Sequence, residues 1–359
     1  MRGPASCVGR GVQQTEVVVI GAGQAGLSSA YFLRRSGVDF AALDANPGPG
    51  GAWQHRWPTL RMDTVHGIFD LPGMPFEQPD PGAPAAQAVP EYFAAYEREF
   101  ALDVRRPVSV EAVRDGSDDR LLVDTDAGTW SARAVINATG TWTRPFWPYY
   151  PGQASFGGRQ LHTADYRGPD EFAGQRVLVV GGGTSAVQLL TELADVARTT
   201  WVTRRPPVFR DEPFTADYGR EVVAMVDRRV RAGLPPESIV RATELPLTPQ
   251  LRDARRRGVL DRSPMFDRIT PGGVVWEDGT TLDVDAILWC TGWRSALEHL
   301  APLGLRGPGG GIVVDGSKVV ADPRVHLVGY GPSASTVGAN RAGRTAVRDL
   351  RELLRPAAA

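Results

Sequence analysis

This 359-residue chain has two glycine-rich turns, and the spacing of their glycines is suited to binding the phosphates of a ligand. The first turn runs from Gly21 to Gly26 and has glycine at its first, third and sixth positions. Gly21 permits the tight turn, Gly23 lets backbone N–H groups approach a pyrophosphate, and Gly26 lets a helix pack closely on a strand. Because the N-terminus of that helix faces the phosphates, the turn predicts a dinucleotide site.

An acidic residue, Asp44, follows the first turn at the distance that this kind of site requires. It stands 23 residues after Gly21, at the end of the next predicted strand, where its carboxylate can accept hydrogen bonds from ribose hydroxyls. Its charge would repel a 2′-phosphate, so FAD or NAD fits this site and NADP does not. The alternative is an ordinary glycine turn without a ligand.

The second glycine turn, Gly181 to Ala186, has the opposite charge beside it. Ser185 occupies the position at which we expect the third glycine of the motif, and its small size preserves close packing of helix on strand. The strand end that would carry an acid has Thr203-Arg204-Arg205 instead, and guanidinium groups there would pair with a 2′-phosphate. We therefore expect NADPH in preference to NADH; the alternative is a solvated arginine pair at a sheet edge.

Both turns lie inside predicted strand–helix–strand units. Buried runs at Val17–Ile20 and Val177–Val180 precede the turns, and extended runs at Phe40–Leu43 and Thr200–Val202 follow the helices. The chain thus has two mononucleotide-binding starts and an α/β fold with two Rossmann-like domains. Two unlike dinucleotide sites suggest that hydride enters from a nicotinamide and leaves through a flavin.

The remaining segments complete the two domains. A helix is expected over Glu91–Phe100, a hairpin over Val108–Val135, and strand ends at Thr139-Gly140 and Thr291-Gly292 that face a ligand crevice. The tail offers a strand at Val325–Val328 and an amphipathic helix that returns to the first domain, with Val347, Leu350 and Leu354 on one face. The arginine-rich stretch from Arg205 to Asp267 has no readable pattern and is interpreted as a solvated helical face.

Composition excludes several classes of protein. The formal net charge of −1 gives no field to collect nucleic acid, and no apolar run is long enough to span a membrane. The only cysteines, Cys7 and Cys290, have no ligand spacing, so neither a disulfide framework nor a metal site is expected, and Cys290 is interpreted as a small buried residue. The segment Met1–Thr15 lacks the apolar core of a secretory signal, so a cytoplasmic location is expected.

The segment Phe156–Tyr166 resembles the FxGxxxHxxxY form of the fingerprint of flavin-containing monooxygenases and their Baeyer–Villiger relatives. It precedes the second glycine turn, as it does in that family. With the first turn, Gly50-Gly51-Ala52-Trp53 and the tail from Gly329 to Arg341, the resemblance covers almost the whole chain. The chain is most similar to the short class B monooxygenases, including the plant auxin-synthesis type.

The resemblance implies roles for individual residues. Trp53 would lie near the isoalloxazine ring, Val108 would contact adenine through its backbone, and the last helix would point its N-terminus at the flavin. His162 would position a cofactor or couple the domains. The expected FAD-binding residues are Gly21, Gly23, Gln24, Gly26, Asp44, Gly51, Trp53, Val108, Thr139, Gly140 and Thr336. The expected NADPH-binding residues are Gly181, Gly183, Thr184, Ser185, Thr203, Arg204, Arg205, Thr291 and Gly292.

The resemblance also implies the reaction. NADPH would reduce FAD, and reduced flavin would capture O₂ as a C4a-(hydro)peroxide that inserts one oxygen atom into a small organic substrate. The FAD domain would span residues 1–147 and 305–359, with the NADPH domain, 148–304, inserted between them. A homo-oligomer remains possible. The enzyme rival is an NADPH-dependent reductase or oxidase without oxygen insertion, and the non-enzymatic rival is a nucleotide-sensing regulator that binds the cofactors without turnover.

Two signals about the substrate conflict. Tyr166 ends the histidine motif where Baeyer–Villiger enzymes typically have Trp, which favours oxidation of nitrogen or sulfur over oxidation of a ketone. The stretch from Gly51 through Trp57-Pro58 to Asp63 partly resembles a second Baeyer–Villiger signature, one residue short and with Trp57 in place of Phe or Tyr.

Overall fold

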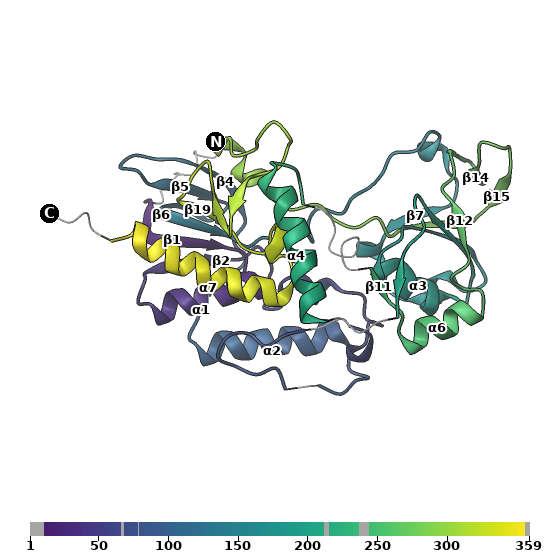
Figure 1. Cartoon of the computed structure of the whole chain (residues 1–359), viewed down its shortest axis with the longest axis horizontal. Helices are drawn as coiled ribbons and strands as arrows, with labels where there is room; N and C mark the ends of the chain where they lie inside the picture. Colours follow the sequence, from purple (N-terminus) through teal and green to yellow (C-terminus); the bar gives the residue numbers. More distant parts are fainter. Residues whose placement is uncertain (1–10, 66–67, 78, 212–214, 237–243, 356–359) are drawn as a thin grey trace, which may run out of the picture.

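The computed structural model describes residues 11–65, 68–77, 79–211, 215–236 and 244–355, and its two main sheets form two units (Figure 1). Both predicted strand–helix–strand units are present, so the predicted α/β class with two Rossmann-like units is confirmed. In the first, β1 (Gln13–Ile20) leads through α1 (Gln24–Arg35) to β2 (Phe40–Leu43). In the second, β8 (Arg176–Val180) leads through α3 (Thr184–Leu193) to β9 (Arg198–Thr203).

The first sheet is built around β1, which pairs in parallel with β2 on one side and β6 (Gly128–Asn137) on the other. β19 (Val325–Leu327) pairs in parallel with β6, so the C-terminal strand belongs to this sheet. The predicted hairpin is β4, β5 and the first half of β6, paired antiparallel. The other strands of this sheet are β3 (Val104–Arg105), β4 (Val110–Asp115), β5 (Leu121–Thr125), β17 (Val314–Asp315) and β18 (Lys318–Val319).

Two helices cover one face of this sheet. Val17 and Val19 of β1 pack with Val347 and Leu350 of α7 (Thr336–Leu353), which lies beside α1 (Figure 1). The apolar face predicted for the last helix is therefore buried. The helix predicted over Glu91–Phe100 is α2 (Ala85–Glu99); it begins earlier than predicted and contains Pro90, which gives up one backbone donor without ending the helix.

The opposite face is covered by elements from the middle of the chain. Val18 and Ile20 share a core cluster with Leu297, with Leu300 of the 3₁₀-helix η6 (Glu298–Leu303) and with Val230 of α4 (Ala216–Arg231). The interpretation of the stretch from Arg205 as a solvated face thus holds for only part of α4. Both α4 and η6 fall within the range 148–304, although they pack on the first sheet; the domain boundaries stay a prediction.

The second sheet is entirely parallel, in the order β12-β9-β8-β16-β7. Its remaining strands are β7 (Arg159–His162), β12 (Arg262–Pro264) and β16 (Ala286–Trp289), with α6 (Pro249–Arg256) nearby. Smaller sheets join β10 (Phe209–Arg210) to β11 (Leu245–Pro246), and β13 (Arg268–Thr270) to β14 (Gly273–Val275) and β15 (Thr281–Asp283). The other 3₁₀-helices are η1 (Gly51–His55), η2 (Met62–Thr64), η3 (Gln153–Ser155), η4 (Thr163–Asp165), η5 (Pro169–Phe172) and η7 (Gly331–Ser333). None of the helices in the described ranges is long and apolar enough to cross a lipid bilayer.

A buried histidine in the first sheet makes stability depend on pH. His326 in β19 is 1% exposed, its Nδ1 lies 3.0 Å from Ser317 Oγ, and burial lowers its pKa to about 4. As the pH falls below about 6.5, the unfolded chain binds the proton first, so the free energy of unfolding decreases between pH 6.5 and 4. Replacing His326 by Gln should reduce that slope by about 1.4 kcal/mol per pH unit.

Urea unfolding of both proteins at half-unit steps of pH measures the difference between the slopes. Because acidic residues titrate equally in both proteins, parallel curves would show that His326 is not the group responsible.

Candidate functional site

Two glycines of the first turn, Gly21 and Gly26, have no room for a side chain. Gly21 has φ +93°, and a Cβ there would lie 2.7 Å from the carbonyl oxygen of Ala138; a Cβ on Gly26 would lie 1.8 Å from the carbonyl oxygen of Gly21. Gly23 is the N-cap of α1. The end of β1, the start of α1 and the end of β6 therefore meet at backbone contact, which leaves the N–H groups at the start of α1 open for phosphate oxygens.

Asp44 is held firmly at the end of β2. It is 3% exposed, and its carboxylate accepts hydrogen bonds from the backbone N–H groups of Ala22 (3.0 Å) and Asn46 (2.8 Å). The Arg106 guanidinium, paired with Glu97 at 2.7 Å, lies 3.7 Å away. The carboxylate is thus fixed beside the glycine turn, where the sequence places the ribose. Val108, predicted to contact adenine, donates its N–H to the Asp44 carbonyl at 2.9 Å.

Two further segments approach the same turn. Gly51 has φ +51°, and a Cβ on it would lie 2.7 Å from Gly23 Cα, so η1 lies directly against the turn. Gln24 donates to Asn340 Oδ1 of α7 at 3.0 Å, while its own Oε1 is buried without a partner among the described residues. An unpaired acceptor beside a phosphate cradle fits a hydrogen-bonding cofactor. Thr336, also predicted here, is the first residue of α7.

The second turn corrects one assignment. Gly181 has φ +133°, and a Cβ on it would lie 2.2 Å from the carbonyl oxygen of Cys290, which repeats the contact of Gly21 with Ala138. Counted in register with the first turn, the residue that corresponds to Gly26 is Ala186, which is 0% exposed, and not Ser185. The prediction for Ser185 was displaced by one residue. Gly183 is the N-cap of α3, and Thr184 and Ser185 begin that helix.

The predicted 2′-phosphate residues lie at the end of β9. Thr203 is buried and its hydroxyl donates to the Arg205 carbonyl at 2.8 Å, which fixes the turn that carries both arginines. Arg204 and Arg205 are exposed, and within the described part of the chain neither has a carboxylate partner. Two cations at the end of the strand that follows the glycine turn are suited to a phosphate.

Two segments cross between the sheets, one after β6 and one after β16, and hydrogen bonds join them to each other. We call them the two crossings. The Thr139 hydroxyl donates to the Ala296 carbonyl at 2.6 Å, and the Thr291 hydroxyl donates to the Phe146 carbonyl. Backbone N–H groups add bonds from Phe146 to Gly292 (2.8 Å) and from Ala296 to Gly140 (3.0 Å). The segments that leave β6 and β16 therefore run side by side.

His162 is buried at the same place. Its Nδ1 accepts from the Ala164 N–H at 3.1 Å, so its Nε2 carries the proton and donates to the Gly292 carbonyl at 3.1 Å. Burial lowers the pKa of His162, so the ring is neutral at pH 7. Both nitrogens are occupied by backbone, which suits positioning of the crossing and leaves neither nitrogen free for proton transfer. Cys290 is buried and its thiol pKa is raised to about 12 by burial, as expected of a packing residue. Cys7 lies outside the described residues.

Sequence reasoning missed a cluster of tryptophans at the crossings. Trp142 and Trp293 stack with ring centroids 5.3 Å apart, and the Arg56 guanidinium lies over both rings and over Trp53. A signal was present, because each strand-end motif, Thr139-Gly140 and Thr291-Gly292, is followed within two residues by a tryptophan.

The segment after η1 also joins the second unit. Trp57 and Leu60 belong to the core cluster of the second sheet, and the Trp57 ring meets Tyr166 edge-on with centroids 6.2 Å apart. Gln188 of α3 donates to the Thr64 carbonyl at 2.9 Å. The residues that partly resemble a Baeyer–Villiger signature therefore connect the two units.

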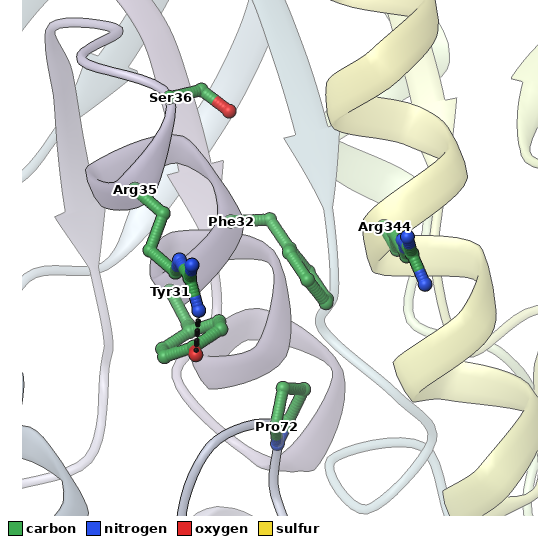
Figure 2. Close-up of a pocket in the computed structure, with 6 residues that line it drawn as sticks. All are labelled: Tyr31, Phe32, Arg35, Ser36, Pro72 and Arg344. Carbon is green, nitrogen blue, oxygen red and sulfur yellow. Dashed lines mark hydrogen bonds between the residues drawn. The ribbon is translucent and has the colours of Figure 1, made fainter.

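A groove between α1 and α7 is separate from these residues. It has a volume of about 420 Å³ and is lined by Tyr31, Phe32, Arg35, Ser36, Pro72 and Arg344. Figure 2 shows Arg35 bonded to the Tyr31 hydroxyl (2.9 Å) and Arg344 across the groove on α7. No predicted site residue lines it. No cluster of His, Cys, Asp and Glu in the described ranges could hold a metal ion.

Comparison with known proteins agrees with this geometry. The family model for pyridine nucleotide-disulphide oxidoreductases matches residues 18–243. The solved flavin-containing monooxygenase from Stenotrophomonas maltophilia is 41% identical, with 96% of this chain and 100% of that chain covered and a TM-score of 0.83. Indole-3-pyruvate monooxygenase YUCCA4 from Oryza sativa subsp. japonica is 30% identical over 354 residues, which cover 82% of this chain and 78% of that protein. The open crystal structure of cyclohexanone monooxygenase shares the fold, at 19% identity, 95% and 88% coverage and a TM-score of 0.65.

Proposed function

The chain belongs to the pyridine nucleotide-disulphide oxidoreductase family and, among its members, to the class B flavin-dependent monooxygenases, and on this premise we propose that it oxygenates a nitrogen or sulfur centre of a small organic substrate. Its cofactors are FAD and NADPH, and O₂ is its co-substrate. The bound flavin supplies the reaction of reduced cofactor with O₂. The protein binds, orients and shields the reactants.

The first glycine turn is the proposed FAD site. Gly21, Gly23 and Gly26 bring the start of α1 to the pyrophosphate, and the Asp44 carboxylate accepts hydrogen bonds from the ribose hydroxyls beside it. The close contact of Gly51 with Gly23 supports a role for η1, with Trp53, at the flavin end. The remaining proposed FAD-binding residues are Gln24, Val108, Thr139, Gly140 and Thr336.

The second glycine turn is the proposed NADPH site. Gly181 and Gly183 open the start of α3 to the pyrophosphate, and the exposed guanidinium groups of Arg204 and Arg205 pair with the 2′-phosphate. The remaining proposed residues are Thr184, Ser185, Thr203, Thr291 and Gly292. His162 holds the crossing between the sites through the Gly292 carbonyl and so acts as a positioning residue.

The proposal that nitrogen or sulfur is the oxidised centre rests on Tyr166. It occupies the last position of the histidine motif, where the ketone-oxidising relatives have Trp, and it is 0% exposed against Trp57. The competing signal, which ends at Asp63, is incomplete, because it is one residue short and has Trp57 in place of Phe or Tyr. The ranges 1–147 with 305–359 and 148–304, a cytoplasmic location and a homo-oligomer are proposed with it.

Rapid mixing of NADPH-reduced protein with O₂ tests oxygen transfer. We expect a lag before oxidised flavin returns and, with a tertiary amine or a thioether present, less than stoichiometric H₂O₂ together with the N-oxide or sulfoxide. Immediate reoxidation with stoichiometric H₂O₂ would instead indicate the oxidase rival. Lactone or ester formation from a ketone, without product from the amine or thioether, would reverse the choice of oxidised centre.

A further inference from the structure

The positive charge of Arg56 has no acidic partner among the described residues. Within the described residues its guanidinium makes no hydrogen bond and no ion pair, and its Nε is buried without a partner. Burial alone lowers the pKa of Arg56, to about 10, and no carboxylate acts in the opposite direction. A buried charge without a counter-charge is costly, so such a group is retained where a ligand can supply the missing charge.

The surroundings of Arg56 are aromatic. Its guanidinium carbon lies 4.9 Å from the ring centroid of Trp142, 5.5 Å from that of Trp53 and 5.7 Å from that of Trp293. Ring faces stabilise a cation but accept few of its hydrogen bonds. The N–H groups of the Arg56 guanidinium can therefore still donate hydrogen bonds to a ligand. We call these four residues the Arg56 cluster.

A second donor in the cluster also lacks a partner. The indole Nε1–H of Trp293 is buried without an acceptor among the described residues. Because buried donors are nearly always paired, two unpaired donors in one cluster indicate a ligand that brings acceptor oxygens. The four residues of the cluster are each partly exposed, so solvent reaches the cluster.

Two neutral histidine rings border the cluster, and the charged groups that act on those rings are Asp44 and Arg167 at His55 and Asp165 at His162. The His55 ring stacks on Trp142 at 5.9 Å, and the His162 ring meets Trp293 edge-on at 5.0 Å. Burial lowers the pKa of both histidines, so both are neutral at pH 7. Among the four residues of the Arg56 cluster the guanidinium is the one charged group, so a complementary ligand brings a negative charge to it.

We propose that Arg56 and the Trp293 indole N–H bind the carboxylate of an aromatic substrate at the crossing between the two sheets. In the proposed function the cofactor phosphates bind at the starts of α1 and α3, so a substrate carboxylate is the anion assigned to this cluster. An aromatic ring next to the carboxylate can pack against the indole rings of the cluster. The inference rests on the proposed function, because it assigns the ligand to the oxygenated substrate.

Isothermal titration calorimetry of the oxidised FAD-loaded protein tests the charge preference. Phenylacetate and phenylacetamide have the same shape and differ in charge; we expect phenylacetate to bind at least tenfold more tightly. In Arg56→Met the dissociation constant for phenylacetate should rise at least tenfold and that for phenylacetamide less than twofold. Arg56→Lys should keep part of the preference, and Trp293→Phe, which keeps the ring and loses the donor, should weaken phenylacetate alone.

The control is Arg344→Met, which removes an exposed arginine from α7 outside the cluster and should leave both constants unchanged. Equal binding of the two ligands by the parent protein, or an unchanged preference in Arg56→Met, overturns the proposal. So does a shift of the flavin midpoint potential in Arg56→Met without any change in ligand binding, since Arg56 would then serve the flavin.

The O₂ reaction of the same preparations separates the two hypotheses. A charge preference that depends on Arg56, in a protein that returns all oxygen as H₂O₂, supports carboxylate binding and overturns the proposed function. Oxygen transfer without a charge preference overturns the inference and leaves the proposed function standing.

Discussion

Replacing Gly26 by alanine is expected to yield a colourless protein without bound FAD. The new Cβ would lie 1.8 Å from the carbonyl oxygen of Gly21, and the obstructing atom is backbone, so α1 must move away from β1. That displacement opens the phosphate cradle and strains a core in which Val17 and Val19 are fully buried. Overpacking of this kind costs about 3 kcal/mol of unfolding free energy. The flavin absorbance of the purified protein and its thermal unfolding measure the two effects.

The matched control lies in the second glycine turn. A Cβ on Gly183 would meet nothing within 4 Å, and its φ of −102° suits any residue. Gly183→Ala should therefore keep FAD and native stability, and it should weaken NADPH because the methyl group stands where the pyrophosphate approaches. A yellow, stable Gly26→Ala protein would show that the first turn does not hold FAD.

The sequence predicted this part of the molecule well because its determinants are local. Strand, turn, helix and acid follow one another between Val17 and Asp44, and each step is dictated by neighbours in the chain. The same pattern misplaced Ser185, because a run of three glycines and further small residues permits two registers. Only the packing of Ala186 against the strand shows which one is used.

The parts that were missed depend on distant segments. Arg56, Trp142 and Trp293 come from three separate regions and meet only because two crossings brace each other. Val230 of α4 packs on the first sheet although the chain around it belongs to the second half of the sequence. Residue spacing along one segment has no information about such contacts, so the two glycine turns could be predicted and the arrangement of the residues between them could not.

Replacing Arg204 and Arg205 together by alanine should convert an NADPH-preferring enzyme into one that accepts NADH equally well. Both side chains are exposed at the end of β9 and, within the described ranges, have no carboxylate partner, so the folded protein loses nothing when they are removed. The 2′-phosphate loses charge-assisted hydrogen bonds, which corresponds to a fall on the order of 100-fold in kcat/KM for NADPH. NADH has no 2′-phosphate, so its kcat/KM should change less than about threefold.

Steady-state rates of flavin-dependent oxidation of the two nucleotides, at low and at high salt, check this result. Arg198→Ala is the matched control, because Arg198 is an exposed arginine at the opposite end of the same strand. It should alter neither constant. A charge effect spread over the whole surface would lower NADPH turnover in both proteins, whereas a specific phosphate contact lowers it only in the double variant. Equal losses for NADPH and NADH would mean that the arginines support the shape of the turn, which the Thr203 hydroxyl already fixes through the Arg205 carbonyl.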